Sequence, residues 1–147
     1  MKTLEIKRYN LVFSFLAFNF LTTRGNMPKT VLIVEDYADT RHMMRFLLQD
    51  FGFEVFEAEN GEEAVAQVKQ FMPDLILMDL SLPIMDGLTA TQIIRKVDGS
   101  AKIPIIAVTA YGKSYYRQAI EAGCDDLINK PLDFDNLEPI LNQYLAP

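Results

Sequence analysis

Short apolar runs alternate with amphipathic stretches from residue 27 onward, and this alternation constrains the fold more than any other feature. The runs have the length and aliphatic composition of strands that are buried on both faces of a parallel sheet. They cover residues 30–34, 54–57, 75–78, 105–108 and 126–128. Strands and helices that alternate with short connections are typical of βαβ units. The sequence therefore predicts a doubly wound α/β domain of five βα units, with a five-stranded parallel sheet in the order 2-1-3-4-5.

The stretches between the runs predict five helices. Asp39 is expected to cap the first helix, and Gly52 is expected to end it after a series of apolar residues at helical spacing. Asn60 is expected to cap the second helix, over residues 61–71. The remaining helices are expected at 87–96, 114–122 and 135–144. Asp86, which precedes the third helix, is interpreted as a turn residue.

Polar side chains with reactive chemistry stand where four of the five runs end. Glu35 and Asp36 follow the first run, Asp79 follows the third, Thr109 follows the fourth and Lys130 lies just beyond the fifth. The carboxyl ends of parallel strands gather at one edge of a sheet, and ligands bind in the crevice outside that edge. We therefore expect these five residues, which are scattered in the sequence, to meet in space.

The charges of this group indicate a divalent cation. Glu35, Asp36 and Asp79 carry three negative charges, and Lys130 supplies one positive charge. Two like charges about 4 Å apart repel by roughly 4 kcal/mol at an effective dielectric constant of 20, so one lysine leaves the group strained. Few carboxylates with room for water suit Mg²⁺, which shares its coordination shell with phosphate oxygens, whereas Ca²⁺ takes more protein oxygens.

A Mg²⁺ site of this kind is suited to phosphoryl transfer. A carboxylate beside the metal can act as a nucleophile and form an acyl phosphate. The metal, Lys130 and the hydroxyl of Thr109 would then each interact with one phosphoryl oxygen. Asp79 is the predicted nucleophile because it follows the third strand, which is central in the predicted sheet. Glu35 and Asp36 are then the predicted metal ligands.

Four motifs at these positions resemble one protein family. VLIVED ends in the acid pair, LILMDLSLPIMDG surrounds Asp79, VTA contains Thr109 and NKP contains Lys130. Together and in this order they resemble the receiver domain of two-component response regulators, over residues 28–146. The resemblance is to the single-domain members that are similar to chemotaxis regulators, and it implies the flavodoxin-like (βα)5 fold.

The resemblance also implies a function. Asp79 would accept a phosphoryl group from a sensor histidine kinase or a histidine phosphotransfer protein, with Thr109 and Lys130 as the other catalytic residues and Mg²⁺ as the cofactor. The implied metal ligands are Glu35, Asp36, Asp79 and Ser81, the last through its carbonyl. The peptide before Pro131 would be cis. Such proteins are not conventional enzymes, but they catalyse their own phosphorylation from small acyl phosphates and their own dephosphorylation, and they signal by binding a downstream protein.

Two residues bear on how this chain would switch. The family usually has Tyr or Phe three residues before the lysine, where this sequence has Leu127. Aromatic gating cannot operate with leucine, so movement of Thr109 and of the loop after the fourth strand would have to carry the signal. Tyr111 stands where the family tunes dephosphorylation, and it is expected to restrict access to the phosphoryl group.

The 147 residues are expected to form one receiver domain, 27–147, after a leader, and no output domain is expected. Residues 1–26 carry a net charge of +3 and an eleven-residue apolar run, which is too short to span a membrane. We interpret this leader as unstructured or as a wrongly assigned start before Met27; a peripheral membrane anchor is the alternative. The remainder carries −9, which disfavours nucleic acid as a partner. The single cysteine, Cys124, fits a cytoplasmic protein and a bland role near a helix end.

Other functions compete with the phosphoreceiver interpretation. A receiver-like scaffold that binds partners without phosphorylation is the main alternative, and Leu127 is its motivation. A nucleotide-binding α/β enzyme is disfavoured because the first loop, EDYADT, has acids where a phosphate cradle needs glycines. His42 is expected at the surface, and Phe46 is a candidate contact for a kinase or phosphotransfer partner. The three tyrosines near the fourth helix are either a partner surface or half-buried rings, and they are Tyr111, Tyr115 and Tyr116.

Overall fold

A computed structural model describes residues 27–146, so the predictions for the leader lie outside the described residues. Five parallel strands form one sheet in the order β2-β1-β3-β4-β5, which confirms the predicted order. The strands are β1 (Thr30–Val34), β2 (Glu54–Ala58), β3 (Leu75–Asp79), β4 (Ile105–Thr109) and β5 (Asp126–Asn129). The helices are α2 (Ala38–Asp50), α3 (Gly61–Phe71), α4 (Gly87–Ile94), α5 (Lys113–Ala122) and α6 (Phe134–Leu145), and a 3₁₀ turn, η1, covers Ser100–Lys102.

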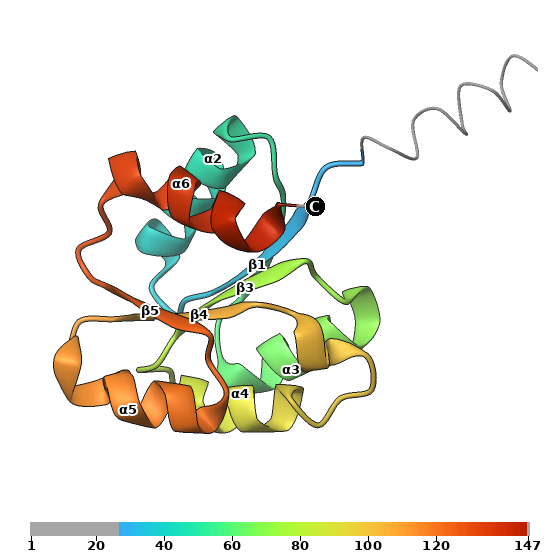
Figure 1. The fold of residues 1–147 in the computed structure, drawn as a ribbon, viewed down its shortest axis with the longest axis vertical. Helices are drawn as coiled ribbons and strands as arrows, with labels where there is room; N and C mark the ends of the chain where they lie inside the picture. The colour runs from blue at the N-terminus through green and yellow to red at the C-terminus, as the bar shows by residue number, and fades with distance from the viewer. Residues whose placement is uncertain (1–26, 147) are drawn as a thin grey trace, which may run out of the picture.

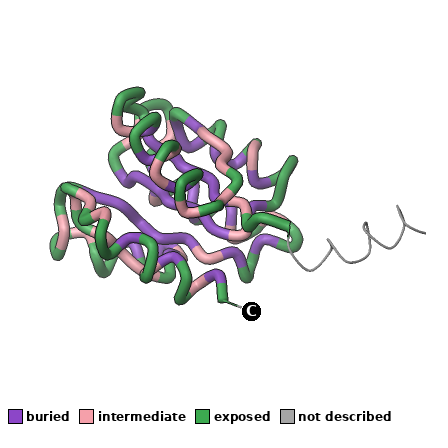
Figure 2. The backbone as a smooth tube through the Cα atoms, turned by 90° about the horizontal axis from the view of Figure 1, so that it is seen from above, coloured by how far each residue is buried: buried purple, intermediate pink, exposed green. Residues whose placement is uncertain are grey.

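The helices cover both faces of the sheet, which makes the fold a three-layer, doubly wound α/β domain as predicted. In Figure 1, α2 and α6 lie on one face and α3, α4 and α5 lie on the other. Side chains alternate along each strand, so β1 sends Val31 and Ile33 into the layer under α2 and α6, and Leu32 and Val34 into the opposite layer. Figure 2 shows the buried strands inside the exposed outer turns of the helices.

The central strands are almost completely buried, and this burial holds the site rigidly. The residues of β3 are at most 5% exposed, and those of β4 at most 2%. Burying one aliphatic side chain of this size contributes roughly 1.5–3 kcal/mol. No helix among residues 27–146 is both long enough and apolar enough to cross a membrane.

Two aspartates have roles that differ from those predicted for them. Helix α2 begins at Ala38 after Tyr37, and Asp39 lies in its first turn without capping it. The connection from β1 is only three residues long, so the helix starts before Asp39. Asp86 caps α4, because its carboxylate accepts a hydrogen bond from the Thr89 main-chain N–H at 2.8 Å. Asn60 caps α3 by accepting from the Glu63 N–H, as predicted.

Most predicted boundaries are correct to within two residues. Strands β2 to β5 each extend one residue further than predicted, so Asp79 and Thr109 are the last residues of their strands. Helix α4 ends at Ile94, two residues early, and η1 was not predicted. Residues 100–102 are a short polar segment without the periodicity that identifies a helix.

Candidate functional site

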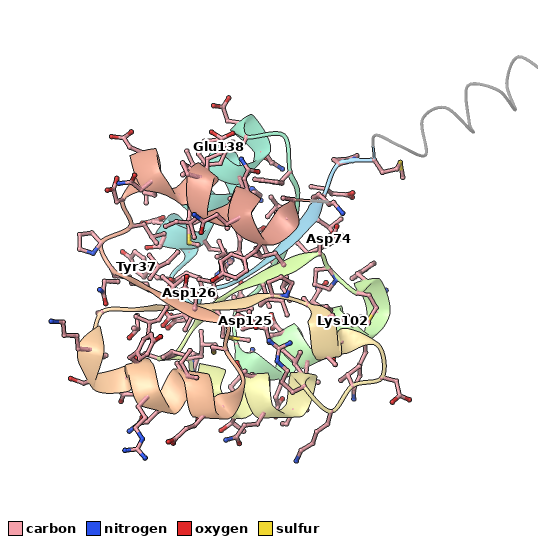
Figure 3. The ribbon with its side chains drawn as sticks, viewed as in Figure 1. Tyr37, Asp74, Lys102, Asp125, Asp126 and Glu138 are labelled. Atoms are coloured by element: carbon pink, nitrogen blue, oxygen red, sulfur yellow. The ribbon has the colours of Figure 1, made fainter. Side chains whose placement is uncertain are left out.

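The carboxyl ends of β1, β3, β4 and β5 lie along one edge of the sheet and carry the five residues expected there. In Figure 3, Tyr37 marks this edge at the left, and Asp74 and Lys102 mark the opposite edge. Glu35 and Asp36 follow β1, and Asp79 ends β3. One carboxylate oxygen from each of these three residues lies within 4.8 Å of the others.

Lys130 links two of the three carboxylates. Its Nζ atom lies 2.6 Å from Glu35 Oε2 and 2.9 Å from Asp79 Oδ2. The main-chain N–H of Lys130 donates to the Thr109 carbonyl at 2.8 Å. This hydrogen bond holds the main chain of Lys130 against the end of β4. The lysine side chain is 25% exposed, whereas those of Glu35 and Asp79 are 4% and 7% exposed. The ion pairs are therefore mostly shielded from water.

The second oxygens of the buried carboxylates are held by main-chain donors. Glu35 Oε1 accepts from the Tyr37 N–H at 3.1 Å, and Asp79 Oδ1 accepts from the Ser81 N–H at 2.9 Å. Asp36 is exposed, and its carboxylate accepts no hydrogen bond from the described residues. The site therefore combines two fixed, buried carboxylates with one that faces solvent.

The ionisation of Glu35 and Lys130 reflects this environment. Burial raises the pKa of Glu35, and the hydrogen bonds from Lys130 and from the Tyr37 N–H only partly offset that effect. Burial alone lowers the pKa of Lys130, but its hydrogen bonds to Glu35 and Asp79 outweigh burial and leave the pKa raised. Lys130 is therefore held as a cation between the two carboxylates.

Thr109 and Ser81 lie at the same edge, but neither side chain is hydrogen-bonded to the Lys130 ammonium group. Thr109 is 1% exposed, and its Oγ1 accepts a hydrogen bond from the Tyr111 N–H at 3.1 Å. Ser81 is exposed and contributes its main-chain N–H to Asp79. The role of its carbonyl as a metal ligand stays a prediction. The Lys130–Pro131 peptide is cis, as the resemblance implies.

Sequence reasoning missed two residues that shape the site. Arg41 lies on α2, where a charged residue is ordinarily exposed, yet it is 7% exposed and its guanidinium donates to the Glu35 carbonyl at 2.8 Å. Gly87 packs against the end of β3, where a Cβ atom would lie 2.1 Å from the Asp79 carbonyl oxygen. The DG pair that ends LSLPIMDG was the only sequence signal for this close approach.

Leu127 lies in β5 and packs against the layer that contains α3, α4 and α5. Beside it is a surface hollow of about 280 Å³ lined by Gly112, Lys113, Tyr116, Leu127 and Asn129. The hollow adjoins the loop between Thr109 and α5. Leu127 therefore borders open space next to the segment that would have to move during switching.

Several other candidate residues lie outside the carboxylate cluster. His42 is exposed, as predicted, and Phe46 is 66% exposed on α2, where its role in docking stays a prediction. Tyr111 is 60% exposed, and its ring centroid lies 5.7 Å from that of Tyr115 on α5. Cys124 is buried just after α5, and burial raises the pKa of its thiol, which fits the bland role expected for it.

The sequence model of the response regulator receiver domain family matches residues 31–142 of this chain. The chain belongs to the response regulator receiver family. Among relatives, it is 42% identical over 121 residues to the chemotaxis protein CheY of Bacillus subtilis, a match that covers 81% of this chain and 99% of that protein. It is 37% identical over 121 residues to the polar-differentiation response regulator DivK of Brucella anthropi, covering 82% and 98%.

Solved receiver domains have the same fold. The receiver domain of sensor histidine kinase PA1611 from Pseudomonas aeruginosa superposes with a TM-score of 0.77 at 30% identity, covering 82% of this chain and 100% of that one. That domain has a magnesium ion coordinated in its active-site cleft. CheY4 of Vibrio cholerae superposes with a TM-score of 0.77 at 28% identity, covering 81% and 100%. As a receiver, the chain has the five parallel strands and five helices of these proteins.

Proposed function

We propose that this receiver accepts a phosphoryl group on Asp79 from a sensor histidine kinase or a histidine phosphotransfer protein, in a Mg²⁺-dependent reaction, and signals by binding a downstream protein. The observation that carries the proposal is the arrangement of three carboxylates within 4.8 Å of one another, with Lys130 bonded to two of them. Family membership supports it, since the relatives include the regulators CheY and DivK.

The donor atoms at this edge fit Mg²⁺. They are carboxylate oxygens, which hard cations prefer, and Asp36 faces solvent where water can complete a coordination shell. Glu35, Asp36, Asp79 and the Ser81 carbonyl would hold the ion. When bound, Mg²⁺ would neutralise carboxylate charge and polarise one phosphoryl oxygen.

The side chains at this edge of the sheet can carry out the phosphoryl transfer. A carboxylate oxygen of Asp79 attacks the phosphorus of a phosphohistidine, a P–O bond forms, and the P–N bond breaks with its electron pair returning to the imidazole nitrogen. The Ser81 N–H holds Asp79 Oδ1 during this attack. Lys130 would exchange one of its carboxylate contacts for a phosphoryl oxygen, which is the positioning that such transfers require.

Thr109 is suited to the third phosphoryl oxygen. Its Oγ1 accepts from the Tyr111 N–H, so the hydroxyl proton remains available for donation. Donation to a phosphoryl oxygen would draw Thr109 and the loop that follows it toward Asp79. This movement would change the surface around α5 and β5 and so the affinity for a downstream protein.

Incubation of the chain with acetyl phosphate and Mg²⁺, followed by intact-mass measurement, tests the proposal without a partner. We expect one added phosphoryl group in the wild type and none in Asp79→Asn. Asp86→Asn is the matched control, because Asp86 caps α4 outside the carboxylate cluster, and it should be phosphorylated. Failure of the wild type to gain mass with small acyl phosphates and with a phosphorylated histidine phosphotransfer protein would sink the proposal.

A receiver-like scaffold that binds partners without phosphorylation is the second candidate, and it is favoured by Leu127, which stands where the family usually has an aromatic residue. The two candidates differ in whether occupation of the site changes distant surfaces. Hydrogen exchange with and without beryllofluoride and Mg²⁺ distinguishes them. Altered protection in the loop before α5 supports switching, whereas changes confined to the carboxylate edge support the scaffold.

The charge of the domain also limits its partners. The −9 carried by the residues after the leader argues for protein partners and against nucleic acid. We expect a cytoplasmic protein that forms one receiver domain over 27–147, with membrane contact only if the leader serves as an anchor.

A further inference from the structure

Arg41 is a buried cation beside the carboxylate cluster. Its side chain is 8% exposed, although it stands on the first turns of α2. Its Nη1 atom donates to the Glu35 carbonyl at 2.8 Å and to the Asp36 carbonyl at 3.4 Å. Its Nη2 atom donates to Glu59 Oε1 at 2.7 Å, beyond the end of β2. The guanidinium therefore joins the acid pair to the neighbouring strand.

Asp36 depends on the contact with the Arg41 guanidinium for its placement more than Glu35 does. The Glu35 carboxylate is held directly, by Lys130 and by the Tyr37 N–H. The Asp36 carboxylate accepts no hydrogen bond from residues 27–146. Among the described residues, the one side chain that donates to Asp36 is Arg41, and it donates to the main-chain carbonyl. The direction in which Asp36 points is consequently set by its main chain, and the main chain is held by the guanidinium.

We infer that Arg41 is a positioning residue for the metal-binding acid pair: by holding the carbonyls of Glu35 and Asp36 it directs both carboxylates toward Asp79. The inference rests on the proposed function, because it assumes that this cluster binds Mg²⁺. Groups that orient metal ligands without touching the metal commonly change metal affinity by about 10–100-fold when they are removed.

Electrostatics alone predicts the opposite effect. Arg41 is positively charged, and its guanidinium lies 3.7 Å from Glu57 and 2.7 Å from Glu59. Removal of Arg41 would leave both glutamates without this partner and make the surroundings of the acid pair more negative. A cation would then be attracted more strongly. The sign of the change in Mg²⁺ affinity therefore separates positioning from charge.

Mg²⁺ titration of the full chain by calorimetry tests the inference, with thermal unfolding measured in parallel. We expect Arg41→Met to bind Mg²⁺ about 10–100-fold more weakly than the wild type. Arg41→Lys keeps the charge but has one nitrogen in place of the planar guanidinium. Its Mg²⁺ affinity should therefore lie between that of the wild type and that of Arg41→Met. Arg95→Met is the matched control.

Arg95 has the same chemistry at a different place. Its side chain is 19% exposed, and its guanidinium donates to the carbonyls of Gly123 and Ile103 at 2.8 and 2.7 Å. Those carbonyls precede β5 and β4, at the sheet edge opposite the cluster. Arg95→Met should lower the unfolding temperature and leave Mg²⁺ affinity unchanged.

The outcomes are distinguishable. Equal or tighter Mg²⁺ binding by Arg41→Met overturns the inference and leaves the proposed function standing. If Arg41→Met does not fold, Arg41→Lys decides, and wild-type affinity in that variant overturns the inference. Weaker binding by Arg95→Met to the same degree also overturns it, because the effect would then follow from stability alone. Absence of Mg²⁺ binding by the wild type overturns the proposed function instead.

Discussion

Lys130 forms ion pairs with Glu35 and Asp79, the two buried carboxylates at the carboxyl edge of the sheet. Both carboxylates are nearly inaccessible to water, and the lysine bonds to each. Charges that are paired in such surroundings become costly when the partner is lost, because the remaining charges are neither solvated nor neutralised. The lysine is thus expected to serve stability as well as chemistry.

Replacement of Lys130 by Met should lower the free energy of unfolding by about 2 kcal/mol, less than for a fully buried pair because the lysine side chain is partly exposed. Urea unfolding in the absence of Mg²⁺ measures this change. Mg²⁺ should restore part of the loss by neutralising the same carboxylates. Arg117→Met, which removes an exposed helical ion pair to Glu121, is the control and should change stability by less than about 0.5 kcal/mol. Equal effects of the two substitutions would contradict this view of Lys130.

Gly87 allows the first turn of α4 to lie against the main chain of Asp79. A Cβ atom on Gly87 would lie 2.1 Å from the Asp79 carbonyl oxygen and 2.9 Å from the Leu80 Cα atom, so the end of β3 would have to move. Gly87→Ala should destabilise the fold by about 1–3 kcal/mol and slow phosphorylation by acetyl phosphate.

Gly52 offers a control for that substitution. It has φ of +89°, but no atom lies within 4 Å of the position of its Cβ. Gly52→Ala should cost about 1–2 kcal/mol through backbone strain alone and leave the phosphorylation rate unchanged. A wild-type rate in Gly87→Ala would show that Asp79 tolerates movement of its main chain.

At the scale of elements, the start of β5 is tied to the last turns of α6 by one hydrogen bond. The Tyr144 hydroxyl donates to Asp126 Oδ2 at 2.9 Å. Burial and this hydrogen bond raise the pKa of Tyr144 to about 12, from 10.0. A pKa that is higher in the folded state means that the protonated hydroxyl stabilises the fold fully below pH 10, and that this contribution is lost as the pH rises toward 12.

Tyr144→Phe should therefore lower the free energy of unfolding by about 1 kcal/mol at pH 8. The difference between the wild type and the variant should shrink as the pH rises from 10 toward 12, because deprotonation removes the same hydrogen bond from the wild type. Urea unfolding of both proteins across this range measures the difference. A difference that stays constant with pH would exclude the hydrogen bond as its source.

The elements themselves could largely be predicted from the sequence, because their signals are local. Buried parallel strands are continuous apolar runs, and β1 was located to the residue. Asn60 was identified as a cap because side-chain caps depend on neighbouring residues. Asp39 was predicted as a cap and lies in the first turn of α2, whereas Asp86 was predicted as a turn residue and caps α4, because the length of each connection decides where the helix begins.

The convergence of the carboxylates could also be predicted, because the topology of a parallel sheet places strand ends together. The contacts of Arg41 could not, because its partners lie on β1, on the loop after β1 and beyond β2, and no local pattern links them. A charged residue on a helix is ordinarily exposed, and the packing that buries Arg41 exists only in the folded chain. Residues that hold the site through hydrogen bonds without lining it are therefore harder to predict than those that line it.

For the whole molecule, occupation of the carboxylate cluster should be linked to global stability. A ligand that binds only the folded state stabilises it by about 2.7 kcal/mol at a concentration of 100 times its dissociation constant. Mg²⁺ should therefore shift urea unfolding of the wild type to higher denaturant concentrations, and the shift should be smaller in Asp36→Asn. Unfolding that does not respond to Mg²⁺ would contradict metal binding at this edge. Ca²⁺ should stabilise less, because few protein oxygens converge there.

Chemical trapping of the acyl phosphate tests whether Asp79 is the phosphoryl acceptor. Borohydride reduces an aspartyl phosphate to homoserine, so the acceptor position can be read by peptide mass spectrometry after reaction with acetyl phosphate and Mg²⁺. We expect homoserine at position 79, with Glu35 and Asp36 unchanged. Homoserine at another aspartate, or phosphorylation that persists in Asp79→Asn, would contradict it.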